Sequence, residues 1–122
     1  MYEKMHELKE LINGPEADRF LNYYYGKYFT GTILLQQDEE QVTLFLYHGT
    51  IVDVVEGVPN EGYEVGVRGT QKEWDAFCAH KSLSVATNKG NEDNLTTLGS
   101  PIRFRQNFNV VAQLVRVYAG IR

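Results

Sequence analysis

The sequence contains a single cysteine, Cys78, among 122 residues. One cysteine excludes an intramolecular disulfide, a cysteine zinc cluster and an iron–sulfur site built from this chain. No stretch approaches the roughly 18 consecutive apolar residues of a membrane-spanning helix, and the charged N-terminus lacks the apolar core of a signal peptide. We therefore expect a protein of the reducing cytoplasm with no stable membrane insertion.

Motifs that hold phosphates or metals are also missing. The glycines form neither the dinucleotide-binding fingerprint nor a P-loop. The three histidines, His6, His48 and His80, have neither the His-x-His nor the i, i+4 spacing of a metal site. The sequence thus predicts no cofactor and no metal.

Acidic residues are absent after Asp93. Residues 1–93 hold sixteen acidic and eight basic residues, a charge of −8, whereas residues 94–122 carry four arginines and no acid, a charge of +4. A net charge of −4 argues against a broad nucleic-acid surface. It leaves room for a local anion site near Arg103, Arg105, Arg116 and Arg122.

What is present is the composition of an ordinary globular protein, with 43% hydrophobic and 23% charged residues. The length predicts one domain, residues 1–122. Apolar spacing predicts helices over 2–12, from 15 or 16 to 26, and from 107 or 109 to 119. Thr70 and Glu73 form a capping box that should begin a further helix carrying Trp74.

Alternating patterns predict strands over 28–36, 41–48, 50–56, 63–68, 95–98 and 102–105. The first three should form an antiparallel meander, because short polar turns join them. Residues 57–62 and 87–94 read as loops. The fold class predicted is α+β.

The apolar residues exceed what a thin core obviously needs. Strands 28–36 and 42–47 carry apolar side chains on both faces, and the last helix is apolar over more than half its circumference. Three structures would use the extra apolar surface: an internal cavity for an apolar ligand, a homodimer interface, or helices packed on both faces of the sheet.

Few residues suggest catalysis. Asp53 interrupts an apolar run and would act as a general base if it faced a dry interior, but it more simply points to solvent. His48 precedes a glycine and fits a turn. Cys78 shares a helix face with Trp74 and Phe77, which favours a buried, inert thiol. A small enzyme using Asp53 or His48 remains the alternative to a binding protein.

Two further groups are candidates for a ligand's polar part. Tyr23, Tyr24, Tyr25 and Tyr28 combine apolar rings with polar tips, which suits a pocket rim, an interface or a plain helix-to-strand junction. Arg103 and Arg105 flank Phe104 and would hold a carboxylate or phosphate, or pair with acids on a neighbouring strand.

The order of elements carries a resemblance. The first segment in this order is Thr30-Gly31-Thr32-Ile33-Leu34-Leu35, which is followed by a paired strand and then by His48-Gly49-Thr50-Ile51. Next come the strand 63–68 and the helix that carries Trp74 and Phe77. The order ends with Leu95-Thr96-Thr97-Leu98-Gly99 and a C-terminal helix. Over about residues 17–120 this order resembles the sterol carrier protein 2-like (SCP2-like) domain. The chain departs from that family in its polar loop 88–94 and in ending without a peroxisomal address.

The resemblance implies a five-stranded, mostly antiparallel sheet with helices packed on it and a hydrophobic tunnel between the two. Residues 15–122 would form this core, with residues 1–14 as a peripheral N-terminal helix. The implied ligand is a sterol, fatty acid or acyl-CoA, bound without catalysis. We predict that its pocket is lined by Ile33, Leu35, Leu44, Leu46, Trp74, Phe77, Phe104, Val111 and Leu114, with the strand positions depending on a register the sequence does not fix.

Overall fold

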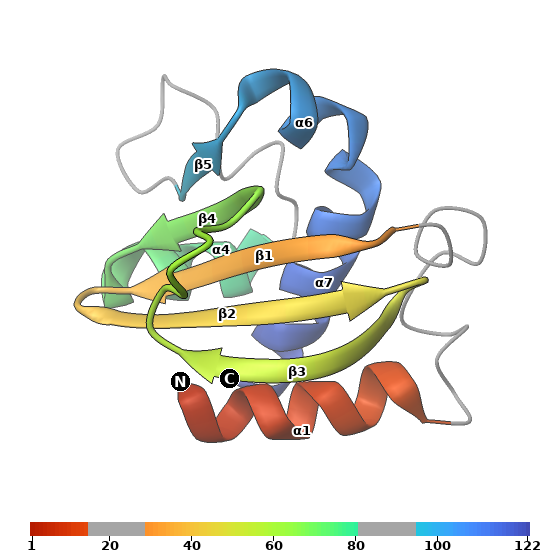
Figure 1. Cartoon of the computed structure of the whole chain (residues 1–122). Coiled ribbons are helices and arrows are strands. Elements are labelled where there is room, and N and C mark those ends of the chain that lie inside the picture. Colours follow the sequence, from red (N-terminus) through yellow and green to blue (C-terminus); the bar gives the residue numbers. More distant parts are fainter. Residues whose placement is uncertain (15–28, 81–94) are drawn as a thin grey trace.

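The computed structural model describes residues 1–14, 29–80 and 95–122 (Figure 1). Its elements in chain order are α1 (Tyr2–Asn13), β1 (Gly31–Gln37), β2 (Glu40–Tyr47), β3 (Thr50–Glu56), β4 (Val65–Gly69), α4 (Gln71–His80), β5 (Thr96–Gly99), α6 (Pro101–Gln106) and α7 (Phe108–Ile121). The expected helix 15–26, the tyrosine cluster 23–28 and the loop 87–94 lie outside the described residues.

The strands form one five-stranded sheet in the order β3-β2-β1-β4-β5. The pairs β1–β2, β2–β3 and β4–β5 are antiparallel, and β1–β4 is parallel. The predicted α+β class, with helices on a mostly antiparallel five-stranded sheet, is therefore confirmed. The meander β1-β2-β3 is also confirmed.

Two tight hairpins fix the register of the meander. Asp38 and His48 are the non-glycine residues with left-handed backbone among those described, with φ of 53° and 50°. His48 precedes Gly49, whose φ is 80°, so this pair makes the left-handed turn that suits a two-residue hairpin. The interpretation of His48 as a turn residue is confirmed.

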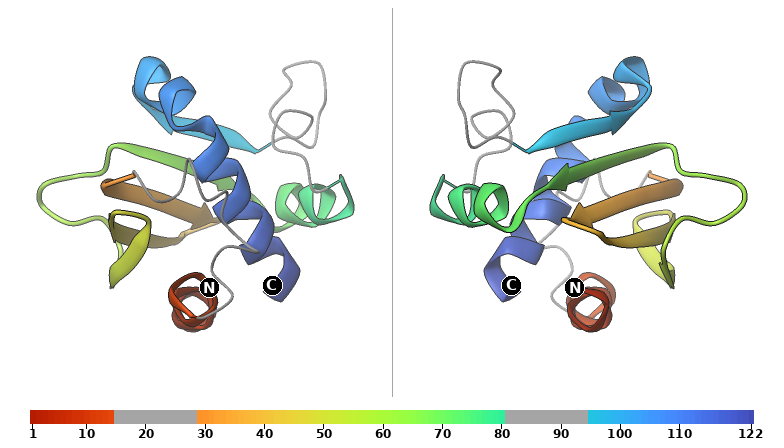
Figure 2. Two further views of the ribbon diagram at one scale, coloured as in Figure 1. Left: turned by 90° about the vertical axis from the view of Figure 1, so that its right-hand side faces the viewer. Right: turned by 90° about the vertical axis from the view of Figure 1, so that its left-hand side faces the viewer.

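The two faces of the sheet have different covers (Figure 2). Helices α1, α4 and α7 lie against the face that carries Ile33 and Leu35, where a single apolar core collects their buried side chains. The segment 57–64 crosses the opposite face on its way from β3 to β4, and Thr43 Oγ1 donates to the carbonyl of Gly57 over 2.8 Å. Leu34 and Thr43, on this second face, are therefore buried as well.

Helix α1 belongs to the core and is not peripheral. Its residues Met5, Leu8 and Ile12 are fully or nearly fully buried in the common cluster. Asn13, at its C-terminal end, bonds both backbone groups of Ile51: its Nδ2 donates to the carbonyl over 2.7 Å, and its Oδ1 accepts from the amide over 2.8 Å. The helix is thus attached to the outer edge of β3.

The predicted capping box is present. The Thr70 hydroxyl accepts from the Glu73 amide over 3.1 Å, and the Glu73 carboxylate accepts from the Thr70 amide over 2.8 Å. These two bonds satisfy backbone donors at the start of α4. Helix α4 therefore begins where the sequence predicts.

The strand predicted over 102–105 is wrong, because these residues belong to helix α6. Ser100 is its N-cap, with its hydroxyl accepting from the Arg103 amide over 3.4 Å, and Pro101 occupies the first turn. A serine cap followed by proline is a helix start signal that outweighs the short alternation around Phe104. The strand predicted over 63–68 begins later, at Val65, and buries Gly66 as well as Val65 and Val67.

Candidate functional site

The nine residues predicted to line a pocket meet in one place. All nine belong to the apolar cluster between the sheet and the helices, and each is at most 8% exposed. That they line a ligand pocket stays a prediction. The layer in which they lie is the candidate site.

The register explains why the four strand positions share a face. Ile33 lies opposite Leu44 on β2 and opposite Val65 on β4, and Leu35 lies opposite Val42 and Val67. Alternation along each strand sends these side chains toward the helices and their neighbours to the other face. Leu46 follows the same alternation. The register shift beside it adds one residue, Val52, to β3, and this bulge lets Ile51 as well as Val54 face the helix side.

Trp74 is the most constrained aromatic residue of the cluster. Its indole Nε1 donates to the carbonyl of Gln36 over 2.9 Å, so α4 is tied to β1. Its ring packs edge-to-face against Phe77, at 6.1 Å between centroids, and against Tyr118, at 5.2 Å. The only tryptophan of the chain therefore reports directly on this layer.

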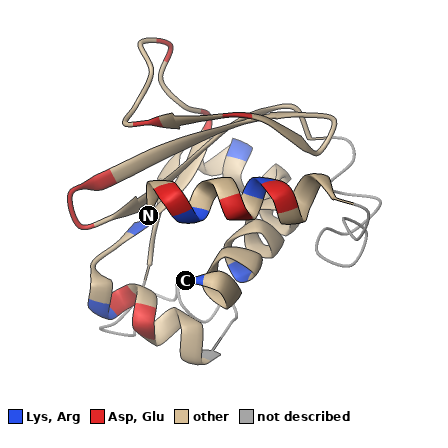
Figure 3. Cartoon of the chain, turned by 90° about the horizontal axis from the view of Figure 1, so that it is seen from below, with Lys and Arg blue, Asp and Glu red and all other residues tan. Residues whose placement is uncertain are grey.

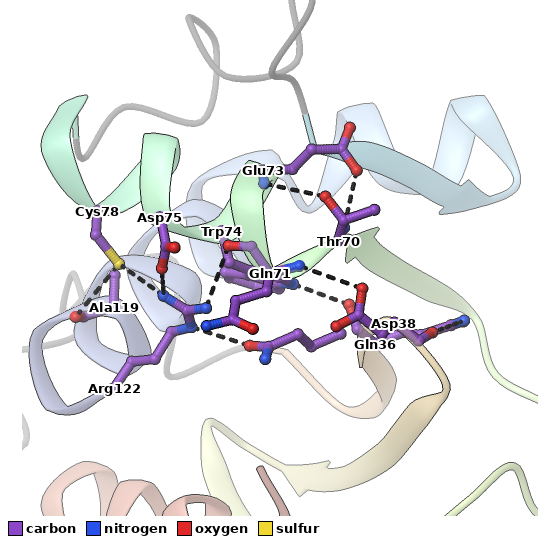
Figure 4. Close-up of polar contacts among 11 residues, drawn as sticks. Gln36, Asp38, Thr70, Gln71, Glu73, Trp74, Asp75, Cys78, Ala119 and Arg122 are labelled. Atoms are coloured by element: carbon purple, nitrogen blue, oxygen red, sulfur yellow. Dashed lines mark hydrogen bonds and ion pairs between the residues drawn. The ribbon is translucent and has the colours of Figure 1, made fainter.

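One end of the layer is polar and closed by Arg122 (Figure 4). The guanidinium reaches the Asp75 carboxylate at 2.5 Å, the Gln37 side-chain oxygen at 2.9 Å and the Gln71 carbonyl at 3.4 Å. Partial burial lowers the pKa of Arg122, but its hydrogen bond to Asp75 raises it, and the net shift is upward. This arginine links the end of α7 to α4 and β1.

Tyr118 lies inside the layer beside this arginine. Its side chain is 1% exposed. Burial raises the pKa of its phenol, and the nearby Arg122 guanidinium opposes that shift. The layer thus has an apolar middle, with a phenol and a guanidinium at one end.

Cys78 is half-buried next to the same group. Its Sγ lies 3.8 Å from Arg122 Nη1 and 3.8 Å from the Ala119 carbonyl oxygen. The sequence predicted a buried thiol, whereas the structure leaves Cys78 half-buried. The sequence also gave no sign of Arg122, which is 44 positions away. Its hydrogen-bond neighbours among the described residues do not include a histidine or a carboxylate.

The residues considered for catalysis lie outside the layer. Asp53 is exposed, and its Oδ1 accepts from the amide of Val54 over 2.9 Å. His48 is exposed in its hairpin, with its ring against Tyr47. Neither side chain faces a dry interior, so the condition that would make Asp53 a general base is not met.

Arg103 and Arg105 are separated by the helical geometry of α6. Arg103 Nη2 bonds the Glu64 carboxylate at 2.6 Å. Arg105 is exposed and has no ion pair within the described parts of the chain. The two therefore do not form the paired anion clamp that a shared strand face would give.

Two surface hollows lined by described residues lie away from these nine residues. One of about 230 Å³ lies between Tyr2 and the β1–β2 turn. Another of about 290 Å³ lies between Arg68 and the first turn of α4. Neither touches any of the nine residues, and within residues 1–14, 29–80 and 95–122 no group of three metal-ligating side chains occurs.

Sequence reasoning missed part of the layer. Val65, Val67, Val115 and Tyr118 are buried in it together with the α1 residues Met5, Leu8 and Ile12. The signals existed: Val65 and Val67 alternate on one strand, and Met5, Leu8 and Ile12 have helical spacing. What the sequence could not supply was the packing of α1 beside α7.

The comparisons with known proteins bear on the fold. No protein-family model and no curated protein matches the sequence. The structure is similar to the solution structure of a conserved hypothetical protein from Thermus thermophilus that is suggested to be a sterol carrier protein. The TM-score is 0.63 at 13% identity, over 93% of this chain and 82% of that chain. At this identity, the likeness is one of fold.

Proposed function

We propose that this protein binds and carries a hydrophobic small molecule, such as a sterol, fatty acid or acyl-CoA, in the layer between the sheet and helices α4 and α7. One observation supports the proposal above the others: the layer contains no charged side chain among its described buried residues. A hydrocarbon ligand suits such surroundings, whereas a polar substrate would lose its hydration without compensation. The shared fold with a suggested sterol carrier protein agrees with this choice.

The mechanism is burial without covalent chemistry. Removing ligand hydrocarbon from water contributes about 25 cal/mol per Å². To admit a ligand, α7 and the sheet must separate locally, since Val111 and Leu114 are now fully buried. The phenol of Tyr118 and the guanidinium of Arg122 are the polar groups at the end of the layer that would bind the polar end of a ligand.

A dimer built on the apolar face of α7 is disfavoured by the same burial. Leu114 is fully covered within the chain, because α7 packs on the sheet with α1 and α4 beside it. A partner chain would find this face already occupied. Dimerisation through another surface remains a separate prediction.

Two measurements test the proposal. Native mass spectrometry of the freshly purified protein should show a co-purifying lipid, and added fatty acids, acyl-CoA or sterols should change the emission of Trp74. The substitution Val111→Phe fills the layer, so it should weaken binding about tenfold or more at a stability cost of about 1–3 kcal/mol. The matched control Val58→Phe adds the same ring at an exposed position of the crossover, the segment 57–64 between β3 and β4, and should leave the ligand affinity unchanged.

Circular dichroism establishes that Val111→Phe is folded. If that variant does not fold, Val115→Ile adds a single methylene to the same helix face and serves in its place. A mass without adduct, together with unchanged Trp74 emission across the whole ligand panel, would remove the proposal.

A further inference from the structure

The most exposed large apolar side chain among the described residues is Ile102, at 69%. Single apolar residues on a surface are ordinary and need no explanation. Ile102 differs from the other exposed ones in its neighbours. Val52 precedes Asp53, and Val58 lies between Glu56 and Glu61, whereas Ile102 precedes Arg103 and lies three positions before Arg105.

The helical geometry of α6 directs Ile102 away from the core. At about 100° per residue, Ile102 projects roughly opposite to Phe104, which is buried in the core. Arg103 and Arg105 then project to its two sides, about 100° and 60° away. The helix therefore presents Ile102 between two arginines, of which Arg103 is ion-paired with Glu64.

The base of this surface is firmly attached. Phe104 packs against Phe108, with 6.2 Å between ring centroids. Asn107 Nδ2 donates to the Arg103 carbonyl over 2.9 Å and closes the C-terminal end of α6. The helix thus holds Ile102 in place without any contribution from the Ile102 side chain itself.

The charge distribution selects the partner. Acidic residues mark the β1–β2 turn, the crossover and the first half of α4 (Figure 3). Residues 95–122 hold no acid, and α6 lies at the opposite end of the molecule from α1 (Figure 1). An anionic surface would therefore be repelled by most of the protein and attracted at α6.

We propose that α6 is a membrane-docking surface, in which Ile102 enters the interface of an anionic lipid bilayer while Arg103 and Arg105 contact lipid phosphates. Apolar side chains flanked by arginines are typical of such peripheral contacts, because the long arginine side chains reach the headgroups. Arg103 contributes less than Arg105, since Glu64 already pairs with it. The contact is weak and reversible, and it needs no ligand in the core.

Vesicle flotation of the protein without added ligand tests the proposal. The protein should float with vesicles of phosphatidylcholine mixed with phosphatidylglycerol, less with phosphatidylcholine alone, and less when salt is raised. Ile102→Ser should lower the vesicle-bound fraction about tenfold, and Arg105→Gln about fivefold. The controls Val52→Ser and Arg116→Gln remove an exposed valine and an exposed arginine elsewhere and should change nothing.

Several results would overturn the proposal. These are no flotation with anionic vesicles, equal losses in the control variants, or a dimer that Ile102→Ser converts to monomers without affecting vesicles. The last would assign the surface to a protein contact. Ligand titration of Ile102→Ser in solution, followed by Trp74 emission, separates this test from that of the proposed function, because the core is unchanged.

Discussion

Gly66 shows how one residue sets the spacing of the sheet. It lies in β4 opposite Leu34 of β1, on the face that the crossover covers. A Cβ at this position would lie 2.7 Å from the Leu34 carbonyl oxygen and 2.9 Å from its Cβ. Because these atoms belong to a central strand, they cannot move aside, and only glycine fits.

We expect Gly66→Ala to lower the free energy of unfolding by about 2 kcal/mol, since the added methyl forces the central strands apart. Gly120→Ala is the control, because a Cβ there meets nothing within 4 Å. In helix α7 that change should be neutral or stabilising by up to about 1 kcal/mol. Urea unfolding measures the free energy of unfolding of both variants. Equal values for Gly66→Ala and Gly120→Ala would contradict the close approach of Gly66 to Leu34.

Tyr118 makes the stability of the folded chain depend on pH in the alkaline range. Its pKa in the folded chain is raised above 10.0 by burial. The unfolded chain therefore loses this proton at lower pH than the folded chain does. The stabilisation is complete below about pH 10 and is lost as the pH rises through the folded-state pKa.

We expect the melting temperature to fall above about pH 10, and to fall less steeply in Tyr118→Phe, which has no proton to lose. Thermal unfolding followed by circular dichroism across this range provides the measurement. Tyr47→Phe, at an exposed tyrosine, is the control and should retain the slope of the wild type. Identical slopes in all three proteins would count against a buried phenol.

At the level of whole elements, β3 has an outer edge that α1 protects. Asn13 bonds both backbone groups of Ile51, and the side chain of Asp53 accepts from the amide of Val54. Side chains thus satisfy backbone groups that would otherwise be available to another strand. The exposed carboxylate that looked like a catalytic candidate has this structural use.

Asn13→Ala should lower the free energy of unfolding by about 1 to 2 kcal/mol, because two hydrogen bonds are lost. It should also promote aggregation through the uncovered edge of β3. Light scattering and urea unfolding measure the two effects. Asn60→Ala, in the exposed crossover, is the control; similar behaviour of the two variants would show that the edge is protected by other means.

Local signals predicted some elements and not others. The capping box at Thr70 and Glu73 located the start of α4, because both of its partners lie within three residues. Around Phe104 the alternation of polar and apolar residues suggested a strand, yet Ser100 and Pro101 start a helix. A segment of six residues is too short for its apolar periodicity to distinguish a helix from a strand, so the N-cap at Ser100 is the more reliable signal.

At the scale of the whole molecule, the contents of the core were largely predictable and its closure was not. The nine residues chosen from pattern and resemblance all lie in one cluster, since apolar side chains of several elements must share one interior. The contacts of Arg122 with Gln37 and Asp75 span 85 and 47 positions. No periodicity in the sequence connects such distant residues, and only the fold brings them together.

A ligand in this core should stabilise the whole chain, because it binds the folded state and not the unfolded one. Saturation at about a hundred times the dissociation constant adds about 2.7 kcal/mol to the free energy of unfolding. We therefore expect any fatty acid, acyl-CoA or sterol that changes Trp74 emission to raise the melting temperature in a concentration-dependent way. Val111→Phe should abolish the rise and Val58→Phe should retain it. A ligand that alters the emission without raising the melting temperature would be adsorbing to the surface, and the layer between the sheet and α7 would then be a solid core.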